Sequence, residues 1–358
     1  MDHQLRRTAL AGELPELAVD GFYITTPTNV RYLTGFTGSN GQALVTGQEA
    51  VFFTDGRYTE QARHEVPDME RVTYLGAFGG PLAEQAGRLG VTRLGFEAHH
   101  VTVRSLERLV AALPGVELVA LGDSVGRLRW VKDADEMANL GGAQAATDQA
   151  FEDILEFLAV GQTEIAVARR LEMLLRRDGA DGLSFDSIVA FGENAAEPHH
   201  EPNHRVLEEG DVIKLDFGAL YAGYHADMTR TVAFGEPPTE LKKIHDVVKQ
   251  SQQAGIDAVA AGTSGRDVDA AARSVIDDAG YGQYFTHGLG HGVGLDVHEG
   301  PSLGLRAGDQ VLPTGAVVTV EPGIYIPGLG GVRIEDMVEV TDDGCRVLGT
   351  SSRDLIEL

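Results

Sequence analysis

Short runs in which apolar and polar residues alternate occupy the first third of the chain, and this alternation predicts β-strands. Apolar residues at helical spacing stand between these runs, at 81–89 and again after Val101. Together the segments predict one small α/β domain built on a single sheet. The predicted strands are residues 21–25, 42–46, 50–55, 94–98 and 116–121.

The pattern changes near residue 126, and longer helices follow. Asp133 and Glu136 have the spacing of a capping box, which predicts a helix that begins there and runs to about Leu158. Because 358 residues exceed the usual size of one hydrophobic core, we predict two domains, 1–126 and 127–358. Further helices are predicted at 163–179, 239–261 and 266–279.

Strand-like segments lie between and after the later helices, joined by turn-rich stretches rather than by helical crossovers. Such connections favour an antiparallel sheet with helices on its back. The whole chain is therefore predicted to be α+β. These later strands are predicted at residues 185–192, 212–220, 227–235, 317–323 and 332–340.

Charge narrows the classes of partner. The net charge of -25 would repel phosphate backbones and anionic lipid surfaces, so we expect neither nucleic-acid nor membrane binding.

The first twenty residues lack the apolar core of a secretory signal, and no segment approaches about 20 uninterrupted apolar residues. We therefore expect a cytoplasmic protein. The single cysteine, Cys345, excludes an intrachain disulfide and has no neighbouring His or Cys for a metal site.

Carboxylates recur on the polar faces of the predicted strands. In VIKLDFG the apolar residues share one face, so Asp216 lies on the other. The hairpin-like GALYAGYHA separates Asp216 from Asp227 and can bring the two side by side. By the same alternation Glu321 ends a strand at a Pro-Gly turn, and Glu335 shares a face with Arg333.

Four carboxylates on one sheet face would repel one another by roughly several kcal/mol in a partly dry site, which predicts bound cations. Two divalent ions carry the matching positive charge. His287, His291 and His298 stand in the glycine-rich HGLGHGVGLDVHEG, and an imidazole ligand favours a transition metal over Mg²⁺.

The motifs LDFGALYAGYHADMTRT, THGLGHGVGLDVHE, VTVEPGIYI and GGVRIED together resemble those of the Xaa-Pro aminopeptidases and prolidases. NVRYLTGFTGSNG, residues 29–41, is similar to the N-terminal domain of the same family. The resemblance implies a pita-bread catalytic domain at 127–358 behind a smaller creatinase-like α/β domain. It also implies a homodimer in which the N-terminal domain packs near the partner's active site.

Residue roles follow from the same resemblance. Asp216 would chelate one metal, Asp227 and Glu335 would bridge both metals, and His291 and Glu321 would complete the shell of the second. The implied supporting residues are His199, chosen over the adjacent His200, with His287, His298 and Arg333. Mn²⁺ is the expected metal, with Zn²⁺ and Co²⁺ as alternatives.

The implied reaction is attack by a metal-bridging hydroxide on the carbonyl that precedes proline. Glu321 would take or shuttle the proton, and His298 would stabilise the oxyanion. His199 and His287 would orient the proline side of the substrate. Arg333 would hold Glu335 rather than touch the substrate.

Alternatives within and outside this family remain open. Many prolidases carry an arginine shortly after VHE to bind the substrate carboxylate; here Ser302 stands at that position and Arg306 lies close by. We therefore expect an aminopeptidase acting on longer proline-containing peptides, with a dipeptidase as the alternative. A methionine aminopeptidase lacks the N-terminal domain and GGVRIED, and a creatinase-like hydrolase lacks the ligands. The remaining hypothesis is a peptide-binding module without catalytic activity.

Overall fold

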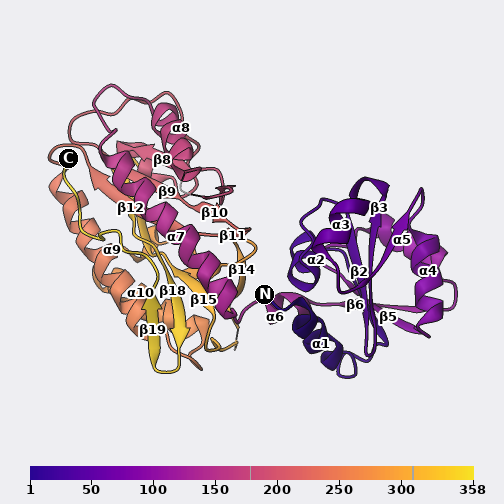
Figure 1. Ribbon diagram of the computed structural model, residues 1–358. Helices are drawn as coiled ribbons and strands as arrows, with labels where there is room; N and C mark the ends of the chain where they lie inside the picture. Colours follow the sequence, from indigo (N-terminus) through magenta and orange to yellow (C-terminus); the bar gives the residue numbers. More distant parts are fainter. Residues whose placement is uncertain (178, 309) are drawn as a thin grey trace. The chain divides into compact units, whose positions relative to one another are not determined.

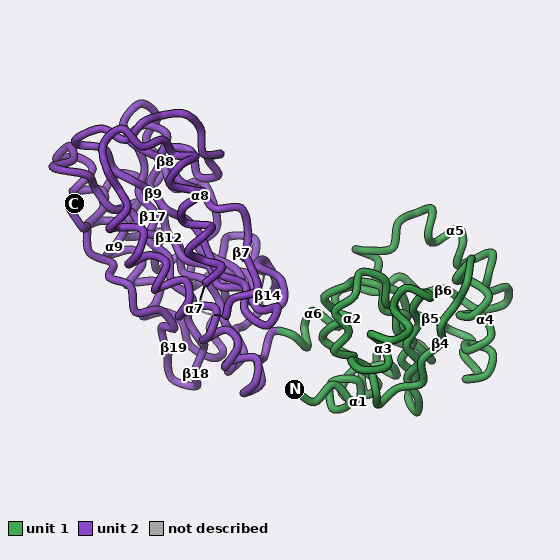
Figure 2. Tube along the Cα trace, turned by 45° about the horizontal axis from the view of Figure 1, so that its top comes forward, with its two compact units in different colours: residues 1–129 green, residues 130–358 purple. Residues whose placement is uncertain are grey.

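The computed structural model describes residues 1–177, 179–308 and 310–358. The chain forms two compact units, Met1–Arg129 and Trp130–Leu358 (Figure 2). This division lies three residues beyond the boundary predicted after residue 126. We propose that the two units are the two domains.

The first unit contains a mixed six-stranded sheet with the order β4-β3-β2-β1-β5-β6. The sequence predicted every strand except β4, whose polar residues are mostly exposed at the sheet edge. It also predicted α4 and α5 but not the earlier helices. The strands are β1 Gly21–Ile24, β2 Gly41–Thr46, β3 Ala50–Asp55, β4 Glu70–Tyr74, β5 Arg93–Glu97 and β6 Glu117–Leu121; the helices are α1 His3–Glu13, α2 Pro27–Thr34, α3 Thr59–Glu65, α4 Gly79–Arg88, α5 Val103–Ala112 and α6 Ser124–Leu128.

Where the structure describes the second unit, it is built on four long helices: α7 Ala134–Leu155, α8 Glu164–Leu175, α9 Thr239–Ala258 and α10 Gly265–Asp278 (Figure 1). The capping box is confirmed, because the Asp133 carboxylate accepts from the Glu136 amide at 2.9 Å and Glu136 accepts from the Asp133 amide at 3.0 Å. Short 3-10 helices are η1 Gly56–Tyr58, η2 Gly192–Ala196 and η3 Gly282–Tyr284. Among the described residues, no helix is both long and apolar enough to cross a membrane.

The strands of the second unit pair antiparallel in several short sheets rather than in the one sheet that the sequence suggested. Their orders are β12-β9-β8, β14-β13-β15-β18-β19, β16-β17 and β11-β10-β7. The bounds are β7 Gly182–Leu183, β8 Ile188–Phe191, β9 Val212–Phe217, β10 Ala219–Tyr221, β11 Tyr224–His225, β12 Met228–Ala233, β13 Gly290–Gly292, β14 Glu299–Leu303, β15 Val317–Val320, β16 Gly323–Ile326, β17 Gly330–Arg333, β18 Asp336–Thr341 and β19 Gly344–Val347.

Three predicted strands are divided in the structure. Residues 212–220 are divided between β9 and β10, and residues 317–323 extend from β15 to the start of β16. Residues 332–340 alternate as a single strand, but the structure divides them into β17 and β18, with Ile334 and Glu335 between. β17 pairs with β16, whereas β18 pairs with β15 and β19. The break leaves the Glu335 amide free to donate to Thr229 O at 3.1 Å, so Glu335 lies beside β12.

Two apolar clusters fix the faces of these strands. Ile213, Leu215 and Phe217 of β9 pack in one cluster with residues of α7 and α8. Ala316, Val318 and Val320 pack in the other with residues of α9 and α10. Burying one such side chain contributes about 1.5–3 kcal/mol, so a one-residue slip of either strand is strongly disfavoured. The opposite strand faces are left for polar side chains.

Candidate metal centre

Two aspartates reach the same place from adjacent strands. Asp216 lies near the end of β9, and Asp227 immediately precedes β12. In the antiparallel register Thr229 is opposite Asp216, so Asp227 lies diagonally across the strand pair. Since Ile213 and Leu215 face the core, the alternation directs Asp216 to the other side, as predicted from the sequence.

The only histidine among the predicted metal ligands stands on a strand with no room for neighbouring side chains. His291 is the middle residue of β13, between Gly290 and Gly292. A Cβ on Gly290 would lie 2.0 Å from Thr319 O, and one on Gly292 would lie 2.1 Å from Gly300 O. The glycines therefore allow β13 to fit between β14 and β15 while presenting the imidazole.

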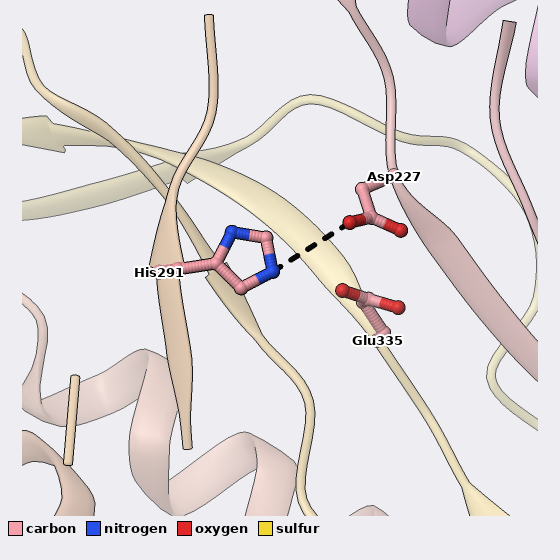
Figure 3. A group of neighbouring side chains, drawn as sticks. All are labelled: Asp227, His291 and Glu335. Carbon is pink, nitrogen blue, oxygen red and sulfur yellow. Dashed lines mark ion pairs between the residues drawn. The ribbon is translucent and has the colours of Figure 1, made fainter. Parts of the chain in front are cut away.

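Asp227, His291 and Glu335 point toward one another from three separate segments (Figure 3). One ligand atom of each lies within 4.8 Å of those of the others. His291 Nε2 is 3.6 Å from Asp227 Oδ2 and 3.3 Å from Oε1 of Glu321, which directly follows β15. Four of the five predicted ligands therefore lie together around the His291 imidazole: Asp227, His291, Glu321 and Glu335. Asp216 lies beside Asp227 in the same cavity.

A cavity of about 290 Å³ collects every predicted site residue. Phe185, Ile188 and Val297 add an apolar wall. His200 instead is buried and contacts Glu164, with its Nε2 2.8 Å from Oε2. The predicted residues that line the cavity are His199, Asp216, Asp227, His287, His291, His298, Glu321, Arg333 and Glu335.

Burial raises the pKa values of two of these carboxyls. The pKa of Asp227 lies well above its ordinary value because of desolvation and then the charge of Asp216. The pKa of Glu335 is likewise raised by desolvation and by Asp227. The metal-free cluster therefore holds protons at a pH where exposed carboxyls would have lost them.

His291 and Glu321 form an ion pair in the same cluster. Burial alone would lower the pKa of His291, but the hydrogen bond and charge of Glu321 raise it to about 9. Burial would raise the pKa of Glu321, yet His291 lowers it to about 2. Both shifts have the direction expected for a charged imidazolium–carboxylate pair.

The donor atoms suit divalent cations. Asp216 Oδ1 and Glu335 Oε1 are buried, and neither has a hydrogen-bond partner within the part of the chain that the structure describes. An unpaired buried carboxylate oxygen is costly, and a metal ion is the partner that would satisfy it. Oxygen ligands with one imidazole fit Mn²⁺, Zn²⁺ or Co²⁺. The residues present therefore fit a divalent-metal centre.

Tyr325 is a site residue to which the sequence reasoning gave no role. Its hydroxyl accepts from Arg333 Nη1 at 2.8 Å and is 2.9 Å from His287 Nε2. Arg333 also donates to Asp216 and, through Nε, to Thr229 Oγ1 at 2.9 Å. Thr229 in turn donates to Glu335 Oε2 at 2.7 Å. One chain of hydrogen bonds therefore connects the carboxylates of Asp216 and Glu335 to His287. The available signal was the tyrosine in GIYI, whose strand partner is a glycine.

A second hollow of about 560 Å³ adjoins the cavity along His287, Gly288 and Gly290. Both Ser302 and Arg306 line it. Arg306 is exposed there, so a cationic side chain stands beside the cavity although Ser302 occupies the position at which many prolidases carry an arginine.

A carboxylate-rich centre on antiparallel strands backed by helices defines a candidate divalent-metal site. The model of metallopeptidase family M24 matches residues 138–342, and that of the creatinase/prolidase N-terminal domain matches residues 6–131. An uncharacterized peptidase of Bacillus subtilis is 45% identical over 343 residues, covering 96% of this chain and 97% of the relative. The chain belongs to metallopeptidase family M24.

Solved structures agree over the whole chain. An Xaa-Pro dipeptidase from Bacillus anthracis has a TM-score of 0.97 at 42% identity and covers 100% of both chains. An X-Pro aminopeptidase from Thermotoga maritima has a TM-score of 0.90 at 36% identity, covering 99% of this chain and 100% of that one. The predicted fold class, a pita-bread catalytic part behind a creatinase-like N-terminal domain, is confirmed, as is the prediction that the chain is a metallopeptidase.

Proposed function

We propose that this protein is a dinuclear-metal exopeptidase that hydrolyses the bond between an N-terminal residue and proline. The observation that carries the proposal is the single cavity in which all nine predicted residues meet. The residues that line the cavity suit this reaction: carboxylates and one imidazole can bind metals, further imidazoles can contact the substrate, and apolar side chains form one wall. The likeness to an Xaa-Pro dipeptidase and an X-Pro aminopeptidase supports the choice of proline.

Asp216, Asp227, His291, Glu321 and Glu335 would hold two divalent ions. When bound, these ions polarise the scissile carbonyl and supply an attacking water of lowered pKa. Glu321, whose Oε1 lies 3.3 Å from His291 Nε2, would receive the proton of that water. The cluster would also attract the free α-amine of a substrate, which favours an exopeptidase.

The surrounding side chains would orient the substrate. Burial lowers the pKa values of His287 and His298, so both imidazoles are neutral near pH 7 and can donate or accept a hydrogen bond. His298 would stabilise the developing oxyanion, whereas His287 and His199 would contact the proline side. Arg333 holds Asp216 and, through Thr229, Glu335, which makes it a positioning residue.

Chain length of the substrate is the open choice between two candidate functions. Ser302 favours an aminopeptidase for tripeptides and longer chains. Arg306, however, lines the hollow beside His287, and the dipeptidase from Bacillus anthracis covers the whole chain, so a prolidase is the second candidate. A homodimer, a cytoplasmic location and Mn²⁺ as the native metal remain proposals based on the sequence.

Three matched substrates distinguish these candidates: a dipeptide Xaa-Pro, a tripeptide Xaa-Pro-Yaa and a tripeptide without proline. We expect the Mn²⁺-loaded protein to cleave the Xaa-Pro-Yaa tripeptide, to cleave the dipeptide weakly and to leave the third intact. A reversed preference that Arg306→Met abolishes would identify a prolidase. If metal binds and neither proline peptide is cleaved, the proposed Xaa-Pro specificity fails.

Metal binding near pH 7 is expected to release protons. The raised pKa values of Asp227 and Glu335, and that of His291 at about 9, mean that protons occupy ligand atoms that a metal must take. Affinity should therefore rise with pH up to about pH 9. Calorimetric titration of Mn²⁺ in buffers with different ionisation enthalpies measures the release.

The control for this titration is His298→Gln, which removes a neighbouring imidazole but no proposed ligand and should leave the proton count unchanged. Heats that are independent of the buffer would contradict the protonated state of the metal-free cluster.

A further inference from the structure

His199 lies in a segment with little regular structure of its own. Residues 191–203, called here the His199 segment, contain the short helix η2 and then run without helix or strand to Asn203. His199 itself is exposed at the cavity wall. Its place must therefore be set by what holds the neighbouring backbone.

Lys214 holds the segment from the sheet side. It lies on β9, on the same strand face as Asp216, and its side chain is fully buried. Its Nζ donates to Ala195 O at 3.1 Å, to Glu197 O and to Pro198 O at 3.4 Å. Three backbone carbonyls immediately before His199 thus converge on one amine.

The contacts of Lys214 do not depend on a carboxylate partner. The protonated side chain of Lys214 has three N–H donors, one for each of the three backbone carbonyls that it contacts. Pro198 O also accepts from Arg333 Nη1 at 3.2 Å, so the same carbonyl is fixed from the metal centre. The ring of Tyr325 covers the amine, with its centroid 5.2 Å from Nζ.

Glu164 holds the segment from the helix side. This residue begins α8 and is fully buried. Its Oε1 accepts from the Phe191 amide at 2.8 Å and from Asn194 Nδ2 at 2.9 Å. Its Oε2 accepts from the Asn203 amide at 3.0 Å and is 2.8 Å from His200 Nε2. Both ends of the segment, and the residue after His199, are therefore tied to one carboxylate.

We propose that Lys214 and Glu164 are positioning residues that together fix His199 at the proline side of the substrate. A buried ionisable group is costly, and a helix-capping or core role would not require an amine to gather three carbonyls of one loop. Fixing the backbone on both sides of His199 restricts its side chain to the cavity and leaves His200 outside it. The inference rests on the proposed function, since it assigns His199 to substrate binding.

A double-mutant cycle tests the proposal with the metal-loaded full chain and an Xaa-Pro-Yaa tripeptide. We expect His199→Ala and Lys214→Met each to lower kcat/KM at least about tenfold, mainly by raising KM, with metal stoichiometry unchanged. In the His199→Ala background Lys214→Met should change kcat/KM by less than about twofold, because coupled residues do not add. Glu164→Gln should behave similarly and serves if Lys214→Met does not fold.

The matched control is Asp148→Asn. Asp148 is buried on α7 and accepts from the amides of Thr350 and Ser351, so its loss loosens the C-terminal residues without touching the His199 segment. Its effect should multiply with that of His199→Ala. If both Lys214→Met and Glu164→Gln multiply in the same way, the positioning role is overturned. If the unaltered protein cleaves no Xaa-Pro bond, the proposed function itself has failed.

Discussion

Glu321→Gln is expected to leave a folded, metal-binding protein whose kcat is lower by about 10²- to 10⁴-fold, the usual contribution of a positioned acid–base group. Glutamine keeps the size of the side chain and one oxygen for Thr319 Oγ1, which donates to Glu321 Oε1 at 3.3 Å. It cannot accept the proton of an attacking water. Asp216, Asp227, His291 and Glu335 remain to hold metal, so binding should weaken rather than vanish.

Turnover at saturating Mn²⁺, metal content per chain and the melting temperature of the variant separate the two roles of Glu321. The control is Glu339→Gln on β18, because Glu339 pairs with Arg346 at the surface and lines no part of the cavity. Its turnover should stay within about twofold of the unaltered protein. Near-normal turnover of Glu321→Gln would show that Glu321 does not transfer the proton. Loss of metal content would show that Glu321 acts chiefly as a metal ligand.

Strand alternation explains how the position of Asp216 could be predicted from the sequence. The core face of VIKLDFG is apolar at every second residue, and a slip by one residue would place Lys214 and Asp216 among the apolar side chains of α7 and α8. The same local reasoning placed Glu321 at the end of a strand. Local pattern therefore determines which side of a strand faces the site.

Non-local contacts decided what the sequence could not. The alternation in 332–340 continues through Glu335, but its two halves pair with different strands, and the Glu335 amide between them donates to Thr229, more than a hundred residues away. His199 and His200 are indistinguishable by pattern, and the contact of His200 with Glu164 on α8 separates them. The sequence GIYI predicts that Tyr325 is a core residue. Its contacts with His287 and Arg333 become evident only when β16 is paired with β17.

Removal of the metal is the second large effect that we expect. Chelation should lower kcat/KM by at least about 10²-fold, because the ions supply several kcal/mol of transition-state stabilisation. Added Mn²⁺ should restore activity, whereas Ca²⁺, which prefers more oxygen ligands, should not. Full activity of protein shown by elemental analysis to lack metal would contradict the proposed centre.

Stability gives a readout of the same centre that is independent of activity. Ligand at one hundred times its dissociation constant stabilises a fold by about 2.7 kcal/mol, which for a unit of this size raises the melting temperature by roughly 5–10 °C. The transition of Trp130–Leu358 should show that rise with Mn²⁺. Without metal, the carboxyls with raised pKa values favour the fold at low pH, and this contribution is lost as the pH rises through those values.

Glu335→Gln tests this argument most directly, because glutamine resembles the protonated acid that the metal-free site prefers. The variant should melt at the same or a higher temperature than the unaltered protein when both lack metal at pH 8, since glutamine is neutral without taking up a proton from solution. It should also lose most of the rise produced by Mn²⁺. A lower melting temperature without metal would instead show that Glu335 chiefly stabilises the fold, through its bond with Thr229.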